Sequence, residues 1–290
     1  MTQNGYEATV DIETNLQMTP SKGTTITIAG KKQGSLNSSA TFRHILNLEQ
    51  PAGQSGTNLA VVKDQVQLDD NADQINPVSV PHQLSYSSKK TQASTRDIAD
   101  YDSWSTNHVG LNWLSTVDYA ELWTDSNHVY KNPDQDFMNL KYPVFKDNCT
   151  NFVSQALHEG GLKTKNATVI SRKHDDVWSY EAFAQLGPTY TWGGAENNYR
   201  YMKNYSGAFS SDNDPTHIGP GGIIYADWTG NGSKDHAAIV VGNISTKSAS
   251  IPVICQKTHN EHEQPLTTLE NYAKDKYHGA TKWYGLQWAK

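Results

Sequence analysis

The chain has 290 residues, more than a single domain of about 150 residues requires, and a length that suits two domains of unequal size. Its 30 acidic and 24 basic side chains leave a net charge of -6, which argues against a surface built to bind nucleic acid or anionic lipid. No run of 18 apolar residues is present. The charge leads us to expect no nucleic-acid partner, and the lack of a long apolar run leads us to expect no membrane insertion. We also expect a monomer.

Aromatic residues divide the chain unevenly. Residues 1–100 carry three of them, Tyr6, Phe42 and Tyr86, whereas residues 101–290 carry the other 26. The segment 87–95 consists of small and polar residues and has the composition of a linker. This contrast predicts a boundary near residue 95, with a β-rich accessory domain at 1–95 and a second domain at 96–290.

The first part contains only strand patterns. Alternating and β-branched residues, separated by turn residues, predict strands at 6–14, 24–28, 42–48, 59–68 and 78–86. Short strands at this spacing, without a helix between them, are typical of a β-sandwich. We therefore predict a small all-β, sandwich-like domain without a catalytic constellation.

The second part begins with helices and ends with strands. A helical pattern covers residues 103–123, a short helix begins near residue 149, and strands are predicted at 222–226, 236–241 and 251–257. This order of elements indicates an α+β domain.

Cys149 is predicted in the first turn of the short helix. Asn148 is a suitable N-cap and Gly160–Gly161 a suitable helix end. Apolar residues at 152, 153, 156 and 157 place Cys149 on the buried stripe, whereas residues 150, 151, 154 and 155 should face away. The helix N-terminus should lower the pKa of the thiol and offer backbone N–H groups to an oxyanion. A lone cysteine on an apolar stripe is also often a core residue.

The two cysteines, Cys149 and Cys255, are too few for a disulfide framework, and a nucleophilic role needs Cys149 to be a free thiol. His236 opens the second strand of a predicted hairpin, where a histidine is either structural or exposed to a site at the end of the sheet. The turn at 227–235 has the oxygen spacing of a calcium loop, but Ala238 stands where such loops need a glutamate. We expect a plain turn, and no metal or cofactor.

Together these segments resemble a known family. The string Cys-Thr-Asn-Phe-Val-Ser-Gln at 149–155, the Gly160–Gly161 pair, and Asp235-His236 before a valine-rich strand are similar to an amidase-domain family, a bacterial branch related to NlpC-type and CHAP peptidases. The resemblance runs from about residue 101 to the C-terminus. It implies a papain-like cysteine hydrolase in which Cys149 is the nucleophile and His236 the base.

The resemblance also implies a third residue that orients the histidine from the next strand. The family's Gln-His pair is replaced here by Gln256-Lys257, so we predict His259 as the orienting catalytic residue, with Gln256 and Asn260 as alternatives. The acidic residue expected before the cysteine is displaced to Asp147. Predicted substrate-binding residues are Asn148, Asn151, Trp192, Trp228 and Gln256.

The implied function is hydrolysis of amide bonds, in peptidoglycan or a related peptide substrate, by an amidase or an endopeptidase. An antibacterial toxin with the same chemistry and an inactive cell-surface adhesion protein that binds wall material are the alternatives. The first 30 residues show no export signal. We expect an extracellular or cell-surface protein whose signal is not part of this chain.

Overall fold

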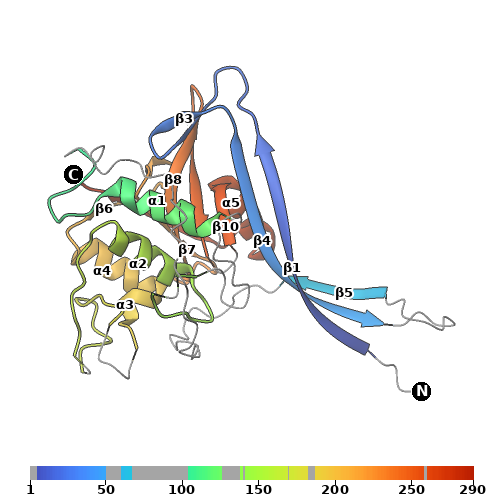
Figure 1. Cartoon of the computed structure of the whole chain (residues 1–290), viewed down its shortest axis with the longest axis horizontal. Coiled ribbons are helices and arrows are strands. Elements are labelled where there is room, and N and C mark those ends of the chain that lie inside the picture. The colour runs from blue at the N-terminus through green and yellow to red at the C-terminus, as the bar shows by residue number, and fades with distance from the viewer. Residues whose placement is uncertain are drawn as a thin grey trace, which may run out of the picture.

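A computed structural model describes most of the chain, which is a mixed helix–sheet structure dominated by an antiparallel sheet (Figure 1). The described residues are 5–49, 60–66, 104–125, 138–139, 141–168, 170–181, 187–257 and 260–290.

The strands are β1 (Gly5–Met18), β2 (Thr25–Ile28), β3 (Lys31–Gln33), β4 (Leu36–Glu49), β5 (Ala60–Val66), β6 (Phe209–Asp212), β7 (Ile223–Asp227), β8 (His236–Ser245), β9 (Ser250–Gln256), β10 (Asn260–Pro265) and β11 (Lys282–Trp288). The helices are α1 (Trp113–Thr124), α2 (Cys149–Glu159), α3 (Tyr190–Gly193), α4 (Ala195–Asn204) and α5 (Leu266–Lys276), with a short 3-10 helix, η3 (Pro215–His217).

The sheet joins the two ends of the chain. Its strand order is β1-β4-β10-β9-β8-β7-β11-β6, and β2 also pairs with β8, β3 with β2, and β5 with β4. In Figure 1, β1 and β4 form a long two-stranded ribbon that runs beside the body and extends beyond it toward the N-terminus. The C-terminal half of the chain therefore supplies the centre of the sheet, and the N-terminal strands extend it.

Two hydrophobic layers cover the sheet because side chains alternate along its strands. On β7, Ile223 and Tyr225 pack in the core with α1 to α4, whereas Ile224 and Ala226 pack in a second core with α5. The same alternation continues on β8 and β9. Among the described residues, α1 to α4 therefore lie on one face of the sheet and α5 on the other.

The N-terminal strands belong to the larger of these two cores. Ile26 and Leu36 are fully buried within it. β2 approaches β8 so closely that a Cβ added to Gly242 would lie 2.1 Å from the carbonyl oxygen of Thr27. This arrangement differs from the predicted separate sandwich, because alternation identifies a strand but not the strand with which it pairs.

The predicted boundary near residue 95, like the predicted strand at 78–86, lies outside the described residues. The first helix begins later than predicted because the Asn112 side chain accepts a hydrogen bond from the N–H of Ser115 at 3.0 Å and caps α1 there. In the described part of the chain, no helix is both long and apolar enough to span a bilayer.

Two leucines test whether the N-terminal strands share the core. Leu36→Ala should lower the free energy of unfolding by about 2–5 kcal/mol, because Leu36 is completely buried. Leu16→Ala is the matched control, since Leu16 is 51% exposed, and should change it by less than about 0.5 kcal/mol. Every tryptophan lies after residue 100, so tryptophan fluorescence in urea reports on the C-terminal part. An unchanged fluorescence transition in Leu36→Ala would indicate a separate domain.

Candidate active site

Helix α2 lies in the middle of the helical layer and is buried along almost its whole length. Residues 149–157 are all buried, so the polar residues predicted to face away from the core lie inside the molecule as well. The helix ends as predicted: Gly161, at φ 101°, adopts the left-handed conformation that glycine tolerates. Its polar side chains must therefore find partners within the protein.

Asn148 and Asn151 have structural roles. The Asn148 side chain does not cap α2; instead it donates to the Phe145 carbonyl at 2.7 Å and accepts from the Phe145 N–H at 3.0 Å. Asn151 donates to the Pro143 carbonyl at 2.7 Å and accepts from the indole of Trp192 at 2.8 Å. Both asparagines are fully buried, which differs from the predicted substrate-binding role.

The two tryptophans predicted to bind substrate occupy different positions. Trp192 is fully buried and stacks on Tyr142 with 5.7 Å between ring centroids, so it is a core residue and not a groove wall. Trp228 is 9% exposed, and its ring centroid lies 5.3 Å from that of His236. Trp228 also stacks on Tyr277, with 5.4 Å between ring centroids. The indole of Trp228 thus packs beside the imidazole of His236.

Cys149 is a free thiol, 7% exposed, at the first turn of α2. Its sulfur takes a backbone hydrogen bond from Ala237, the residue after His236, which places the thiol at the start of β8. Burial raises the thiol pKa, and the charge of Asp147 adds to this, while the hydrogen bonds with Thr150 and Ala237 lower it. The predicted lowering of the pKa by the helix N-terminus is therefore outweighed by desolvation.

His236 is held by the strand that follows it. Its Nε2 atom lies 2.6 Å from Oε1 of Gln256, on β9. An amide oxygen only accepts hydrogen bonds, so Nε2 carries the proton and Nδ1 is left as the basic nitrogen. Burial lowers the pKa of the imidazole despite the Gln256 contact, which favours the neutral base at physiological pH.

In the structure, the residue that contacts His236 from the next strand is Gln256. The sequence predicted Gln256 as a substrate-binding residue and as an alternative orienting residue. His259, the first choice for that role, lies outside the described residues. Asn260, the other alternative, accepts a hydrogen bond from the buried ammonium of Lys257 and donates to the Thr124 carbonyl at 2.9 Å. Asn260 therefore fastens β10 to the end of α1.

The turn before His236 is a hydrogen-bonded loop. Asp227, fully buried, accepts from the N–H groups of Asn231 at 3.0 Å and Gly232 at 2.7 Å, one on each carboxylate oxygen. Asp235 accepts from the Trp228 N–H at 2.9 Å. These carboxylate oxygens accept hydrogen bonds from backbone N–H groups, as in an ordinary turn. Within the described ranges, no group of three or more metal-binding side chains is present.

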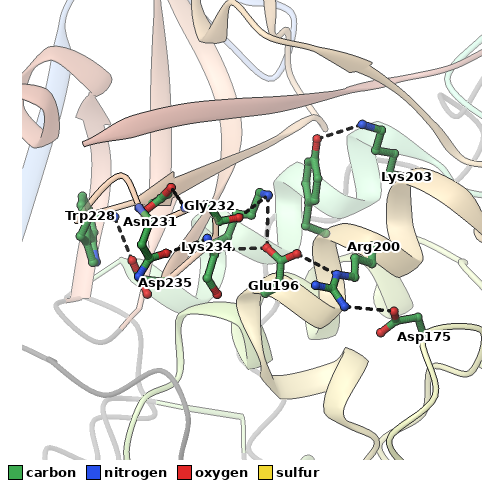
Figure 2. Close-up of polar contacts among 12 residues, drawn as sticks. Asp175, Glu196, Arg200, Lys203, Trp228, Asn231, Gly232, Lys234 and Asp235 are labelled. Atoms are coloured by element: carbon green, nitrogen blue, oxygen red, sulfur yellow. Dashed lines mark hydrogen bonds and ion pairs between the residues drawn. The ribbon is translucent and has the colours of Figure 1, made fainter. Parts of the chain in front are cut away.

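Side chains of α4 contact the turn before His236 through Lys234 (Figure 2). Glu196 accepts from the N–H of Lys234 at 3.1 Å, and the Lys234 ammonium lies 3.2 Å from the same carboxylate. That ammonium also lies 4.4 Å and 4.2 Å from the ring centroids of Tyr199 and Tyr284. Arg200 holds the other oxygen of Glu196 at 2.7 Å. These contacts hold Lys234 two residues before His236, and so restrict where the imidazole can lie.

Comparison with known proteins assigns the chain to a family. Residues 110–280, more than half of the chain, match the family described as "Putative amidase domain". A curated relative, "Uncharacterized protein YhbB" from Bacillus subtilis (strain 168), is 29% identical over 150 residues. That match covers 51% of this chain and 41% of the relative, so the chain spans less than half the relative's length. No solved structure matches, and the papain-like fold stays a prediction. The chain belongs to this amidase-domain family, which indicates hydrolysis of amides.

Proposed function

We propose that the protein is a cysteine-dependent hydrolase of amide bonds in bacterial peptidoglycan. The observation that carries the proposal is the position of Cys149: its thiol, at the N-terminus of α2, is hydrogen-bonded at the start of β8, where His236 is held by Gln256. The proposed nucleophile, base and orienting residue come from three elements that pack together, α2, β8 and β9.

In the proposed acylation step, the Cys149 sulfur attacks the carbonyl carbon of the amide while Nδ1 of His236 accepts the thiol proton. The carbonyl oxygen becomes an oxyanion, for which backbone N–H groups in the first turn of α2 are suitable donors, since the Asn148 side chain does not cap them. The C–N bond then breaks, and the imidazolium gives its proton to the leaving amine. A thioester on Cys149 remains.

In deacylation, His236 accepts a proton from water as that water attacks the thioester carbon. The second tetrahedral intermediate expels the sulfur, which regains its proton from His236. The products are an amine and a carboxylic acid, and the enzyme returns to its starting state.

The electrostatics of the site favour a neutral thiol–imidazole pair over a preformed ion pair. Burial acts on both groups in the same direction, because it raises the thiol pKa and lowers the imidazole pKa. Proton transfer to His236 therefore accompanies the attack on the substrate.

The pH dependence of alkylation tests this protonation state. Iodoacetamide should modify Cys149 at a rate that keeps rising through neutral pH, because the thiol stays protonated below it. Cys255 is the internal control: it is completely buried, desolvation raises its thiol pKa, and it should stay unmodified in the folded protein. Peptide mass spectrometry between pH 5 and pH 9 distinguishes the two sites, and rapid alkylation that is already constant below pH 6 would indicate an ion pair.

Peptidoglycan is proposed as the substrate because the Cys-Thr-Asn-Phe-Val-Ser-Gln string resembles those of wall-cleaving cysteine peptidases, and because the polar composition is common among extracytoplasmic proteins. Both the muramoyl–alanine amide and the bonds of the stem peptide have the chemistry that the proposed mechanism requires. We propose that the enzyme acts outside the cytoplasm, either on the wall of its own cell or on the wall of a rival cell.

Digestion of purified peptidoglycan tests the proposal. The wild-type chain should release soluble fragments with new amino groups, and Cys149→Ala should reduce the release at least about 1,000-fold, because the nucleophile is lost. Cys255→Ala is the matched control and should retain activity, since that buried thiol makes its contacts with His262 and Glu263. Mass spectrometry of the fragments identifies the cleaved bond. Equal release by wild type and Cys149→Ala would contradict the cysteine mechanism.

A further inference from the structure

A buried carboxylate lies directly behind the residue that holds the histidine. Gln256 on β9 and Glu261 on β10 form a cross-strand pair, and the Gln256 Nε2 donates to the Glu261 carboxylate at 2.7 Å. Gln256 is 1% exposed and Glu261 is 6% exposed. The hydrogen bonds therefore run without interruption from His236 through Gln256 to Glu261.

An amide is asymmetric, with a donating and an accepting end, and can be turned round by rotating its last torsion. In the orientation seen, its oxygen faces His236; in the reverse orientation, its NH₂ group would face the imidazole. The reversed amide could only donate, and would then favour the tautomer with its proton on Nδ1. That tautomer has no free Nδ1 lone pair to accept the thiol proton.

Above pH 7 Glu261 is mainly an ionised carboxylate, which accepts hydrogen bonds and cannot donate them, so only the NH₂ end of Gln256 satisfies it. We propose that Glu261 is a positioning residue for catalysis: by fixing the orientation of the Gln256 amide, it fixes the proton on Nε2 of His236 and leaves Nδ1 free to act on Cys149. This role rests on the proposed cysteine mechanism. Glu261 itself touches neither substrate nor thiol.

The surroundings of Glu261 agree with a role other than structural stabilisation. Burial raises the pKa of its carboxyl to about 7, while the charge of His236 and the Gln256 hydrogen bond lower it. A carboxyl whose pKa is raised on folding destabilises the folded state as the pH rises from its unfolded value, near 4.3, through that folded value. Above pH 7 the ionised Glu261 thus opposes folding, as expected of a group retained for function.

Three variants of the full chain test the proposal. Glu261→Gln keeps the size of the side chain but removes its acceptor-only character. Glu263→Gln is the matched control, since Glu263 lies on the same strand, also has a burial-raised carboxyl pKa of about 7, and has no bond to Gln256. In the double variant Glu261→Gln/Gln256→Glu, the new carboxylate accepts from both His236 and the new amide, which restores the original order of donors and acceptors.

The readout is the rate of iodoacetamide alkylation of Cys149 at pH 7.5, which needs no knowledge of the substrate. Glu261→Gln should slow it about 10- to 100-fold, the size of effect seen when the partner behind a metal-bound histidine is removed. Glu263→Gln should match the wild type, and the double variant should regain most of the lost rate. The melting temperature of Glu261→Gln at pH 8 should equal or exceed that of the wild type.

A wild-type rate in Glu261→Gln, or a double variant no faster than Glu261→Gln, would overturn the proposal. A fall in the melting temperature of Glu261→Gln that parallels its loss of reactivity would do so too, because it would indicate a structural role. If the wild-type chain leaves peptidoglycan intact while the alkylation rates follow the expected order, the substrate proposal fails and the role of Glu261 is supported.

Discussion

The burial of α2 is the constraint on which the rest of the molecule depends. A helix with polar residues on every side can be enclosed only if each polar group meets a partner inside the protein. Ser154 binds the Trp192 carbonyl and receives the indole N–H of Trp178 and the amide of Asn198, while Tyr119 donates to Gln155. These partners bring α1, the Trp178 segment, α3 and α4 against one helix. The same burial raises the thiol pKa of Cys149, so the packing that organises the core also favours the protonated form of the proposed nucleophile.

Local features of the sequence predicted local structure well. The strands of the hairpin around 227–235, the helix that begins at Cys149 and its glycine end were all predicted from periodicity and turn residues, and the structure contains them. The environment of those elements was not predicted correctly. Asn151, Ser154 and Gln155 were predicted to face away from the core. Yet each bonds to a residue far away in the sequence, at Tyr119, Trp192 or Asn198, from 36 to 44 positions distant. No pattern within the helix reveals a partner at that distance.

Within the candidate site, the cysteine and the first histidine stand out in the sequence, and the residues behind them do not. Glu261 lies in a polar segment, His259 to Glu263, whose composition predicts a solvated loop. The structure instead places β10 between β9 and β4, with Glu261 opposite Gln256 on one side and Ala40 on the other. Cross-strand register decides both pairings. The β9–β10 pairing is local, but the β4–β10 pairing that encloses Glu261 joins residues more than 200 positions apart. The amide–carboxylate pair could have been found only by predicting residues 260–265 as a strand that pairs with β9.

The pairing of β4 with β10 limits which fragments of such proteins can be used in protein engineering. The family match begins at residue 110, yet β2 and β4, which pair with β8 and β10, lie before it. A gene fragment cut to the matched region would turn β10 into an edge strand with unpaired N–H and C=O groups, a surface that invites association with strands of other chains. The matched segment thus lacks part of its own sheet, and a chimaera designed to keep the proposed chemistry must also carry β2 and β4, which pair with β8 and β10.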